Sequence, residues 1–543
     1  MSEGVFGGRH LAVIGLGESG LAMARWLDRH GARVSVLDSR DSPPSATALA
    51  SDCPGARFVP GPLTLGRFDA DDLPEALYWS PGLSPHIGAA AALFGEAMAA
   101  GIAVRGELDL FADELERRAA DGYRPKVIAI TGTNGKTTVT QLVAHLCREA
   151  GLDTEAAGNI SPSLIDALAA RERAGRLPAV WVLELSSFQL AIAAPLASDA
   201  AAILNLSQNH LDWHPTMADY LESKRRILER TACQVVNLDD AASDPLVPVA
   251  AATGAGAGVS TAGATTGAFA GTAKGPKAEK TVKPARSARS DRSGASARAA
   301  RRIGFALAPP TTTPGFGLVR DGGLAWLAEA SVDPTDISGR RRALASDALV
   351  SRLMPADALR IRGAHNHANA LAALALCRAI NVPTAAMLHG LRDFETADHR
   401  CALVAIHNDV QYVDDSKGTN VGATVAALNG LGKRCILIAG GLGKGQDFTP
   451  LAAPVRRHAR AVMLIGRAAG ELRAALAATG SELLDCATLD EAVVQAAARA
   501  RSGEVVLLSP ACASQDMFRN YSHRAEVFIA AVKRLCTEAG QPC

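Results

Sequence analysis

Residues 132–138 read GTNGKTT, a glycine-rich segment that ends in a lysine and two hydroxyl side chains. Backbone N–H groups in a glycine turn and at a helix N-terminus bind anions, and a lysine at this spacing reaches terminal phosphates. The following hydroxyl is of the kind that holds Mg²⁺. The spacing is shorter than in the standard P-loop, because Ile130 stands where its first glycine belongs. We predict an ATP-type site, rather than a plain turn with a surface lysine, formed by Gly132, Thr133, Asn134, Gly135, Lys136, Thr137 and Thr138.

The elements around this segment are those that a phosphate site requires. The apolar run KVIAIT at 126–131 predicts a strand, and the apolar residues from Val139 to Leu146 have helical spacing. Apolar runs followed by amphipathic patterns recur in three regions, as is typical of βα units on parallel sheets. We predict an α/β fold of three domains: Rossmann-like at 1–117, P-loop ATPase-type with a mainly parallel sheet at 118–395, and Rossmann-like at 396–543.

The composition narrows the class of protein. The chain has 543 residues, of which 48% are hydrophobic and 20% charged, as in globular proteins of several domains. It contains no apolar run of signal-peptide or membrane-span length. Its ten cysteines form no CxxC pair, which favours a reducing cytosol over a disulfide or zinc framework. We predict a cytoplasmic protein without a membrane span.

The segment at about 245–302 differs from the rest of the chain. From residue 250 to its end it holds only three large apolar side chains, and residues 271–302 contain ten Lys or Arg against two Asp or Glu. So little apolar surface cannot offset the entropy of ordering the chain, so we predict a disordered insert in the second domain. The basic run lacks interleaved aromatic residues that would stack on bases, so we do not expect a nucleic-acid partner.

Three more residues are candidates with simpler alternatives. Glu184 ends the apolar run AVWVLEL, and ligand groups of α/β sheets lie at such strand ends. It can be a Mg²⁺ ligand or a carboxylate in water. His210 follows the run AAAILNL, where a structural histidine is the simpler interpretation. Lys224, in YLESKRRIL, has the pattern of an exposed helix lysine.

A second glycine-rich turn lies near the N-terminus. Residues 15–20 read GLGESG after the apolar run HLAVI, and Asp38 ends the next run, RVSVLD. In a dinucleotide-binding domain such a turn cradles the diphosphate and the acidic residue binds a ribose. Taken alone, the pattern predicts an NAD-dependent dehydrogenase, an alternative that leaves the segment at 132–138 without a role.

The segment GTNGKTT resembles the shortened P-loop of the Mur ligase family, the ATP-dependent amide-forming enzymes of peptidoglycan precursor synthesis and their folate-tailoring relatives. The resemblance continues in one order along nearly the whole chain, through SPGL (80–83), GNI (158–160), LELSSFQL (183–190), NHLDWH (209–214), HNHANALAA (365–373), DHR (398–400), DDSKGTN (414–420), GGLGK (440–444) and SPACAS (509–514). It implies that ATP, with two Mg²⁺ ions, converts a carboxylate into an acyl phosphate that an amine attacks. We expect a monomer that adds D-glutamate to UDP-N-acetylmuramoyl-L-alanine.

The resemblance also implies roles for residues near the phosphates. Lys136, Glu184, His210 and Lys224 would be catalytic, and Lys224 would carry a carbamate made from CO₂. A carbamate is an anionic oxygen ligand suited to a hard cation. The metal ligands would be Thr137, Glu184, His210 and Lys224, and further ATP contacts would come from Asn369, Arg400 and Asp415. Because Arg400 begins the third domain, its contact with ATP requires that domain to close over the second and exclude water.

The two remaining substrates are assigned in the same way. The turn at 15–20 would cradle a UDP-sugar instead of a dinucleotide, with contacts from Ser19, Asp38, Ser39, Arg40, Gly82, Asn159 and His210. D-glutamate would contact Thr419, Lys444, Ser514 and Tyr521, since a lysine and hydroxyls suit a dianionic amino acid. Tyr521 stands where a Phe is usual, and GGLGK lacks an acidic residue often found before its lysine.

Two further alternatives stay open, one within the same family and one outside it. A folate-type ligase of the same family is disfavoured by DDSKGTN together with SPACAS. A nonenzymatic P-loop switch or nucleic-acid binder would bind nucleotide without turnover that depends on an amino acid, and its nucleic-acid binding would weaken steeply with salt. Without the resemblance, Asn369, Arg400 and Asp415 would equally suit a helix face, an interdomain ion pair and a turn.

Overall fold

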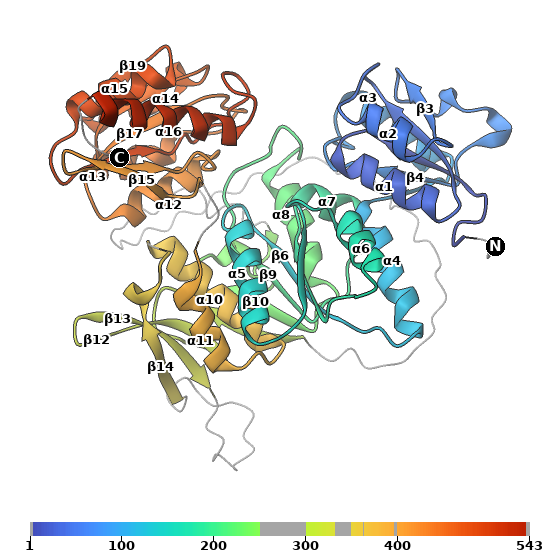
Figure 1. The fold of residues 1–543 in the computed structure, drawn as a ribbon, viewed down its shortest axis with the longest axis horizontal. Helices are drawn as coiled ribbons and strands as arrows, with labels where there is room; N and C mark the ends of the chain where they lie inside the picture. The colour runs from blue at the N-terminus through green and yellow to red at the C-terminus, as the bar shows by residue number, and fades with distance from the viewer. Residues whose placement is uncertain (1–3, 250–299, 332–348, 362, 396–398, 539–543) are drawn as a thin grey trace, which may run out of the picture.

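The structure, a computed structural model, describes residues 4–249, 300–331, 349–361, 363–395 and 399–538. The chain forms three α/β units in sequence order (Figure 1). Most of the predicted insert, residues 250–299, lies outside the described residues. Among the described helices, none is long and apolar enough to cross a membrane.

The N-terminal unit is a five-stranded parallel sheet of order β3-β2-β1-β4-β5. Its central strand β1 is buried throughout, as its apolar sequence predicts. The strands are β1 His10–Ile14, β2 Arg33–Asp38, β3 Arg57–Pro60, β4 Ala76–Trp79 and β5 Ala103–Arg105. The helices are α1 Glu18–Arg29, α2 Ala46–Asp52, α3 Gly88–Ala99 and α4 Glu107–Ala120, with short 3₁₀ turns η1 Leu65–Arg67 and η2 Ala70–Asp72.

The central unit contains a nine-stranded sheet of order β14-β13-β12-β11-β10-β9-β6-β8-β7. Neighbours from β7 to β12 are parallel, and β13 is antiparallel to both β12 and β14. The mainly parallel sheet was predicted, whereas the antiparallel extension β12–β14 was not. The strands are β6 Lys126–Thr131, β7 Thr154–Gly158, β8 Val180–Glu184, β9 Ala200–Ile203, β10 Cys233–Asn237, β11 Arg301–Phe305, β12 Gly315–Asp321, β13 Leu324–Ser331 and β14 Leu349–Pro355.

Helices cover both faces of this sheet because its strands are apolar on both faces. Ile128 and Ile130 of β6 belong to the core under α5 and α10, while Val127 and Ala129 belong to the core under α4 and α6. The helices are α5 Lys136–Glu149, α6 Leu164–Arg173, α7 Ser187–Ile192, α8 Met217–Arg225, α10 Ala364–Ala379 and α11 Thr384–Asp393. Strand β11 begins at Arg301, so the last two residues of the predicted insert are in the sheet.

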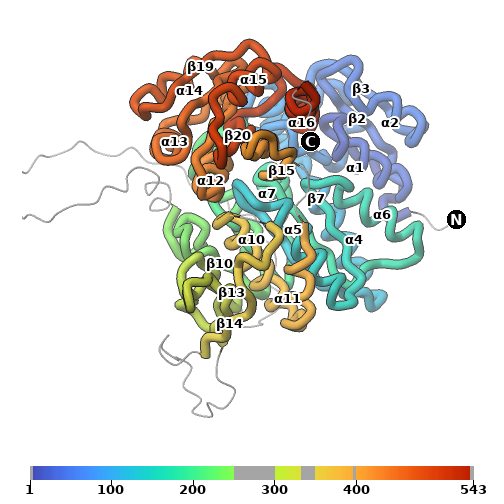
Figure 2. Tube along the Cα trace, turned by 60° about the vertical axis from the view of Figure 1, so that its left-hand side comes forward, coloured from blue at the N-terminus to red at the C-terminus, as the bar shows by residue number. Residues whose placement is uncertain are grey.

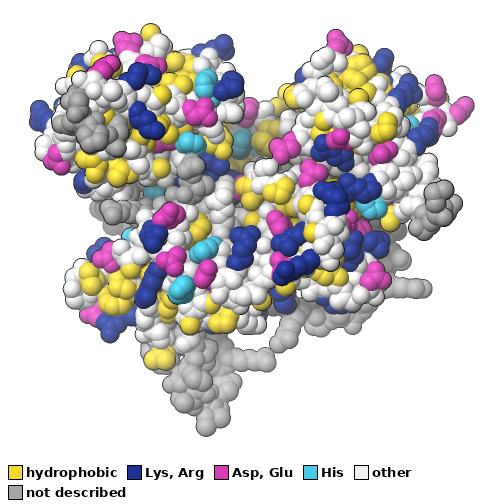
Figure 3. Space-filling view, viewed as in Figure 1, with side chains coloured by type: hydrophobic (Ala, Val, Ile, Leu, Met, Phe, Trp, Pro, Cys, Tyr) yellow, Lys and Arg dark blue, Asp and Glu magenta, His cyan; other side chains and the backbone are white. Residues whose placement is uncertain are grey.

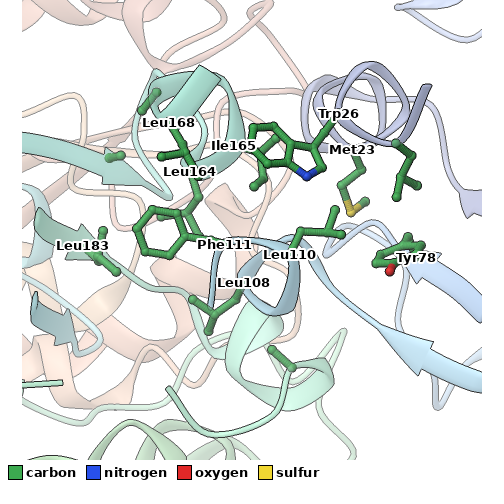
Figure 4. Close-up of a cluster of buried hydrophobic side chains, with 14 of the residues drawn as sticks. Met23, Trp26, Tyr78, Leu108, Leu110, Phe111, Leu164, Ile165, Leu168 and Leu183 are labelled. Carbon is green, nitrogen blue, oxygen red and sulfur yellow. The ribbon is translucent and has the colours of Figure 1, made fainter. Parts of the chain in front are cut away.

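The N-terminal and central units share a hydrophobic core. Helix α4 crosses residue 117 and packs against both α1 and α6, with the apolar side chains of all three in one buried cluster (Figure 4). Phe111 of α4 meets Trp181 of β8 edge-to-face, with ring centroids 5.1 Å apart. Trp26 of α1 and Ile165 of α6 are buried in the same cluster. The first unit is therefore fixed to the second by packing.

The C-terminal unit is a six-stranded sheet of order β15-β16-β20-β17-β18-β19. Only β15 is antiparallel to its neighbour. The strands are β15 Ala402–His407, β16 Val410–Asp414, β17 Cys435–Gly440, β18 Ala459–Ile465, β19 Glu482–Asp485 and β20 Val505–Leu508. The helices are α12 Val421–Leu431, α13 Ala452–His458, α14 Ala469–Leu476, α15 Leu489–Arg499 and α16 Tyr521–Glu538.

The two outer units lie on the same side of the central one. The N-terminal and C-terminal lobes stand apart in Figure 1, and the surface is hollowed between them in Figure 3. In both ribbon and tube views α12 of the C-terminal unit lies next to α10 of the central unit (Figures 1 and 2). The carboxyl end of the central sheet thus faces the C-terminal unit.

Candidate active site

A cavity of about 930 Å³ lies between the central and C-terminal units. The central unit lines it with the glycine-rich segment at 133–138, and the C-terminal unit lines it with the segment at 415–420 and the first turns of α12. The cavity brings together most of the residues predicted near ATP, namely Thr133, Asn134, Gly135, Lys136, Thr137, Thr138, Glu184, His210, Asn369, Arg400 and Asp415.

The glycine-rich segment has the predicted order of strand, turn and helix. β6 ends at Thr131, Gly135 caps α5 in the left-handed region with φ 83°, and α5 begins at Lys136. A Cβ at Gly135 would lie 2.6 Å from the Asn369 side-chain oxygen, so glycine is required by space as well as by conformation. The Lys136 ammonium donates to the backbone oxygens of Gly132 and Thr133, 2.9 and 3.0 Å away. The helix N-terminus and the lysine together form an anion site.

A second loop, after β9, supports the first one. The Asn205 side chain accepts from the backbone N–H of Asn134 at 2.9 Å and donates to its carbonyl at 3.0 Å. The Thr133 hydroxyl accepts from the backbone N–H of Ser207 at 3.0 Å. Neither Asn205 nor Ser207 was singled out from the sequence, although both follow the same strand as His210. They fix the conformation of the phosphate-binding segment.

Glu184 ends β8 inside the cavity, as predicted, and its side chain is 2% exposed. One carboxylate oxygen accepts from the Asn159 amide at 3.0 Å. The other is buried and has no hydrogen-bond partner in the part of the chain that the structure describes. A buried carboxylate oxygen in a polar cavity requires a donor or a cation.

His210 faces the same cavity from a strained backbone, with φ 57°. Burial, together with the charges of Lys136 and Lys224, lowers the pKa of His210 to about 3. The imidazole is therefore neutral at physiological pH, which is the form that binds metal ions or accepts hydrogen bonds. Its ring also contacts Phe188, with ring centroids 4.7 Å apart.

Lys224 is not the exposed helix lysine that its sequence pattern favoured. The side chain is 2% exposed and lies beneath the phosphate-binding segment. Its ammonium donates to the Gly132 carbonyl at 2.9 Å and the Thr131 hydroxyl at 3.2 Å. It also lies 4.8 Å from the Tyr220 ring centroid. Burial lowers the pKa of Lys224 well below its ordinary value, which favours the neutral, nucleophilic amine.

Asp415 and Arg400 are two ionisable side chains that the C-terminal unit contributes to the cavity. Burial raises the pKa of Asp415 to about 7. A hydrogen bond of 2.7 Å from the Ser509 hydroxyl acts in the opposite direction and lowers this pKa. Burial lowers the pKa of Arg400, although nearby carboxylates oppose this. The Arg400 Nε is buried and has no hydrogen-bond partner among the described residues. A buried donor of this kind requires an acceptor, and a bound anion would supply one.

The residues predicted to bind D-glutamate divide into two groups. Thr419 and Tyr521 line the cavity, whereas Lys444 and Ser514 do not. Lys444 is exposed, with φ 55°, and Ser514 is 2% exposed. Lys417, which was not predicted, also lines the cavity, with its ammonium 4.9 Å from the Tyr521 ring centroid. Its position in DDSKGTN was the available signal.

The residues predicted to bind the UDP-sugar lie mostly in the N-terminal unit, away from this cavity. Asp38 accepts from the Leu16 backbone N–H at 2.7 Å and from the Arg40 guanidinium at 2.8 and 2.7 Å. Although burial opposes ionisation, these bonds lower the pKa of Asp38 to about 2. Ser39 and Gly82 are exposed and Ser19 is half-buried. Of the residues predicted to bind the UDP-sugar, Asn159 and His210 line the cavity and the others do not.

Comparisons with known proteins agree with this architecture. Three family models match in order: "Mur ligase MurD-like, N-terminal domain" at 9–106, "Mur ligase middle domain" at 130–283, and "Mur ligase, glutamate ligase domain" at 399–512. The chain belongs to the Mur ligase family. It is therefore an enzyme of the ligase class, and the dehydrogenase alternative is wrong.

Within the family, relatives about half identical to this chain match nearly its whole length. The UDP-N-acetylmuramoylalanine–D-glutamate ligase of Burkholderia vietnamiensis is 50% identical over 99% of both chains. The enzyme of the same name from Ralstonia nicotianae is 49% identical over 97% of both.

Solved structures support the fold. The UDP-N-acetylmuramate-alanine ligase MurC of Thermotoga maritima has a TM-score of 0.51 at 15% identity, over 97% of this chain and 99% of that one. The MurF ligase of Thermotoga maritima, in complex with ADP, also has a TM-score of 0.51, at 14% identity over 97% and 96%. At such identities these likenesses concern the fold alone, and they agree with three α/β units.

Proposed function

We propose that this chain is an ATP-dependent ligase that joins D-glutamate to UDP-N-acetylmuramoyl-L-alanine, releasing ADP and phosphate. The observation that carries the proposal is the cavity in which the segment 133–138 faces the segment 415–420. A ligase needs this arrangement, because one wall must hold the phosphates of ATP while the other brings the amine. Relatives of the same name, about half identical over nearly all of their length, support the choice of substrates.

The chain's own groups suit transfer of a phosphoryl group to a carboxylate. Lys136 and the N-terminus of α5 bind the phosphates, with Asn369 beside them in the central unit. Arg400 and Asp415 approach the nucleotide from the C-terminal unit. Catalysis of such a transfer consists mainly of positioning and of neutralising charge. Arg400 of the C-terminal unit lines the same cavity as the phosphate-binding segment, which supports a closed arrangement that would exclude water from the acyl phosphate.

The residues present fit Mg²⁺. Thr137, Glu184, His210 and Lys224 would hold it, and the buried oxygen of Glu184 that lacks a partner is of the type this ion prefers. When bound, two Mg²⁺ ions would supply charge neutralisation at the transferred phosphoryl group. The neutral imidazole of His210 is compatible with this role.

Lys224 fits a carbamate. An amine attacks CO₂ only when it is unprotonated, and burial favours that form here. The neighbouring Arg225 and Arg226 donate to backbone carbonyls elsewhere, which leaves Lys224 as the cation of this helix nearest the phosphate-binding segment. The carbamate would exchange a buried amine for an anionic oxygen ligand.

The two other substrates are assigned to the flanking units. The UDP-sugar would bind the N-terminal unit at Ser19, Asp38, Ser39, Arg40 and Gly82, with Asn159 and His210 nearer the reacting carboxylate. D-glutamate would bind at Thr419, Lys444, Ser514 and Tyr521, where Lys417 adds positive charge. We further propose a monomer that acts in the cytoplasm on small molecules.

The test is ATP-dependent phosphate release with UDP-N-acetylmuramoyl-L-alanine, comparing D-glutamate, L-glutamate and no amino acid. The proposal requires release that depends on both the nucleotide substrate and D-glutamate. Release that is indifferent to the amino acid would show that the role assigned to the C-terminal unit is wrong.

A further inference from the structure

Two asparagine side chains join the central unit to the C-terminal unit. Asn420 donates to the side-chain oxygen of Asn134 at 2.9 Å, and Asn134 donates back to the side-chain oxygen of Asn420 at 3.3 Å. The two residues are 286 positions apart in the chain. Asn134 belongs to the phosphate-binding segment, and Asn420, which is 5% exposed, immediately precedes α12. The proposed function gives Asn420 no role, and it uses Asn134 only as part of the phosphate-binding segment.

Each partner is fixed within its own unit. The peptide group of Asn134 is held on both sides by the Asn205 amide. The side-chain oxygen of Asn420 also accepts from the backbone N–H of Ala423 at 2.9 Å, which makes Asn420 the N-cap of α12. The amide pair therefore connects two rigid points, the start of α5 and the start of α12.

Close packing beside the pair supports this connection. A Cβ added to Gly422, in the first turn of α12, would lie 2.7 Å from the Ser207 hydroxyl and 3.1 Å from the Asn134 side-chain nitrogen. The helix backbone thus rests directly on the loop that supports the phosphate-binding segment. A larger residue at 422 would displace the side chains of Ser207 and Asn134.

From α12 the connection continues to both loops that carry the predicted D-glutamate residues. The backbone N–H of Val421 donates to the Gln446 side chain at 3.1 Å. Gln446 in turn donates to the carbonyls of Gly443 and Ala511, at 2.9 and 3.3 Å. Gly443 precedes Lys444, Ala511 lies in the segment that leads to Ser514, and Thr419 precedes Asn420 itself.

We propose that Asn420 is a positioning residue of this ligase: through its paired amide with Asn134 it holds the D-glutamate loops in register with the phosphate-binding segment. The inference rests on the proposed function. In register, the amine of D-glutamate attacks the acyl carbon and phosphate leaves. Out of register, water attacks the same carbon, and the products are the original carboxylate and phosphate. Loss of the pair therefore uncouples phosphate release from amide formation.

The test compares four proteins with the full-length chain: Asn420→Ser, Asn134→Ala, the double variant, and Thr488→Ala. Serine retains the cap of α12 but is too short to reach Asn134. Thr488 caps α15 in the same unit and is exposed, so its variant measures the effect of losing a cap away from the site. Each protein is assayed for phosphate released and amide formed at several D-glutamate concentrations.

The expected result for Asn420→Ser is a fall of about tenfold in kcat/KM for D-glutamate, from the loss of two hydrogen bonds. Its ratio of phosphate to amide should rise above the value of the unaltered enzyme, while Thr488→Ala keeps that value. Because the two amides act as one contact, the double variant should be no worse than the poorer single variant.

Three outcomes would overturn the inference: Asn420→Ser resembling Thr488→Ala, an unchanged ratio of phosphate to amide, or losses that multiply in the double variant. These outcomes differ from failure of the proposed function, in which the unaltered chain itself shows no release dependent on D-glutamate. A thermal unfolding curve for each variant detects a folding defect. Such a defect lowers phosphate release and amide formation together, whereas misplacement of the D-glutamate loops changes the ratio of phosphate to amide.

Discussion

Glu107 gives the junction of the first two units a pH dependence that can be measured. The carboxylate begins α4, is 2% exposed, and accepts from the backbone N–H of Ile165 at 3.0 Å, in the first turn of α6. Its second oxygen is buried and has no partner among the described residues. Burial raises the pKa of Glu107 from 4.5 to about 7, and the hydrogen bond from Ile165 opposes this only in part.

The sign and size of the effect follow from linkage. An acid whose pKa is higher in the folded state stabilises the fold fully below the unfolded pKa of 4.5. That contribution is lost as the pH rises to about 7. At about 1.4 kcal/mol per pH unit, the loss is ~3 kcal/mol. Glu107→Gln cannot ionise, so the variant should gain stability relative to the unaltered chain between these pH values and stay level above them.

The assay is the melting temperature of both proteins from pH 5 to pH 8. The difference, variant minus unaltered, should rise with pH by several degrees and then level off. Glu116→Gln is the matched control, because this glutamate is on the same helix and its side chain is 70% exposed. Two melting curves that stay parallel across the pH range would refute the reasoning, since a constant offset reports only the change of side chain.

Three further predictions concern the active site. Lys224→Met should fold, because the buried stem is replaced by a similar apolar one, but should lose ligase activity and any ¹³C signal of a carbamate formed from labelled bicarbonate. Gly135→Ala should weaken binding of an ATP analogue more than tenfold in calorimetry, because the added Cβ meets the Asn369 side chain. Gly151→Ala is the control: Gly151 has a similar φ but open space around it, so this variant should bind the analogue as the unaltered chain does. Arg524→Met should lower stability by ~3 kcal/mol and raise KM for D-glutamate, because this fully buried guanidinium holds the backbone of Ser416 and Cys512. Arg534→Met, on the exposed side of the same helix, should do neither in the same melting and kinetic assays.

The phosphate-binding segment could be predicted because its signal is local. A strand, a glycine turn and an amphipathic helix are consecutive in the chain, and their geometry follows from that order. The alternation along β6 likewise explains why helices cover both faces of the central sheet. Strands β12 to β14 gave no comparable signal, because they form an antiparallel extension outside the βα pattern.

The burial of Lys224 could not be predicted, because it depends on contacts between distant segments. The helix around it is rich in charged residues, and only the fold places this lysine beneath Thr131 and Gly132. The contact between Lys417 and Tyr521 is of the same kind, since it joins the segment after β16 to the start of α16, although the position of Lys417 in DDSKGTN was a signal for the residue itself. Sequence patterns locate residues on elements, whereas pairs of this kind are set by how the elements meet.

The charges left unpaired in the cavity restrict what it can bind. Among the described residues, the Arg400 Nε is a buried donor without an acceptor, and one Glu184 oxygen is a buried acceptor without a donor. An anion alone would satisfy the guanidinium but would be repelled by the carboxylate. A cation alone would satisfy the carboxylate but would be repelled by the guanidinium. A nucleotide phosphate accompanied by a divalent cation satisfies both at once, so the two unpaired atoms favour a metal–nucleotide complex over either component.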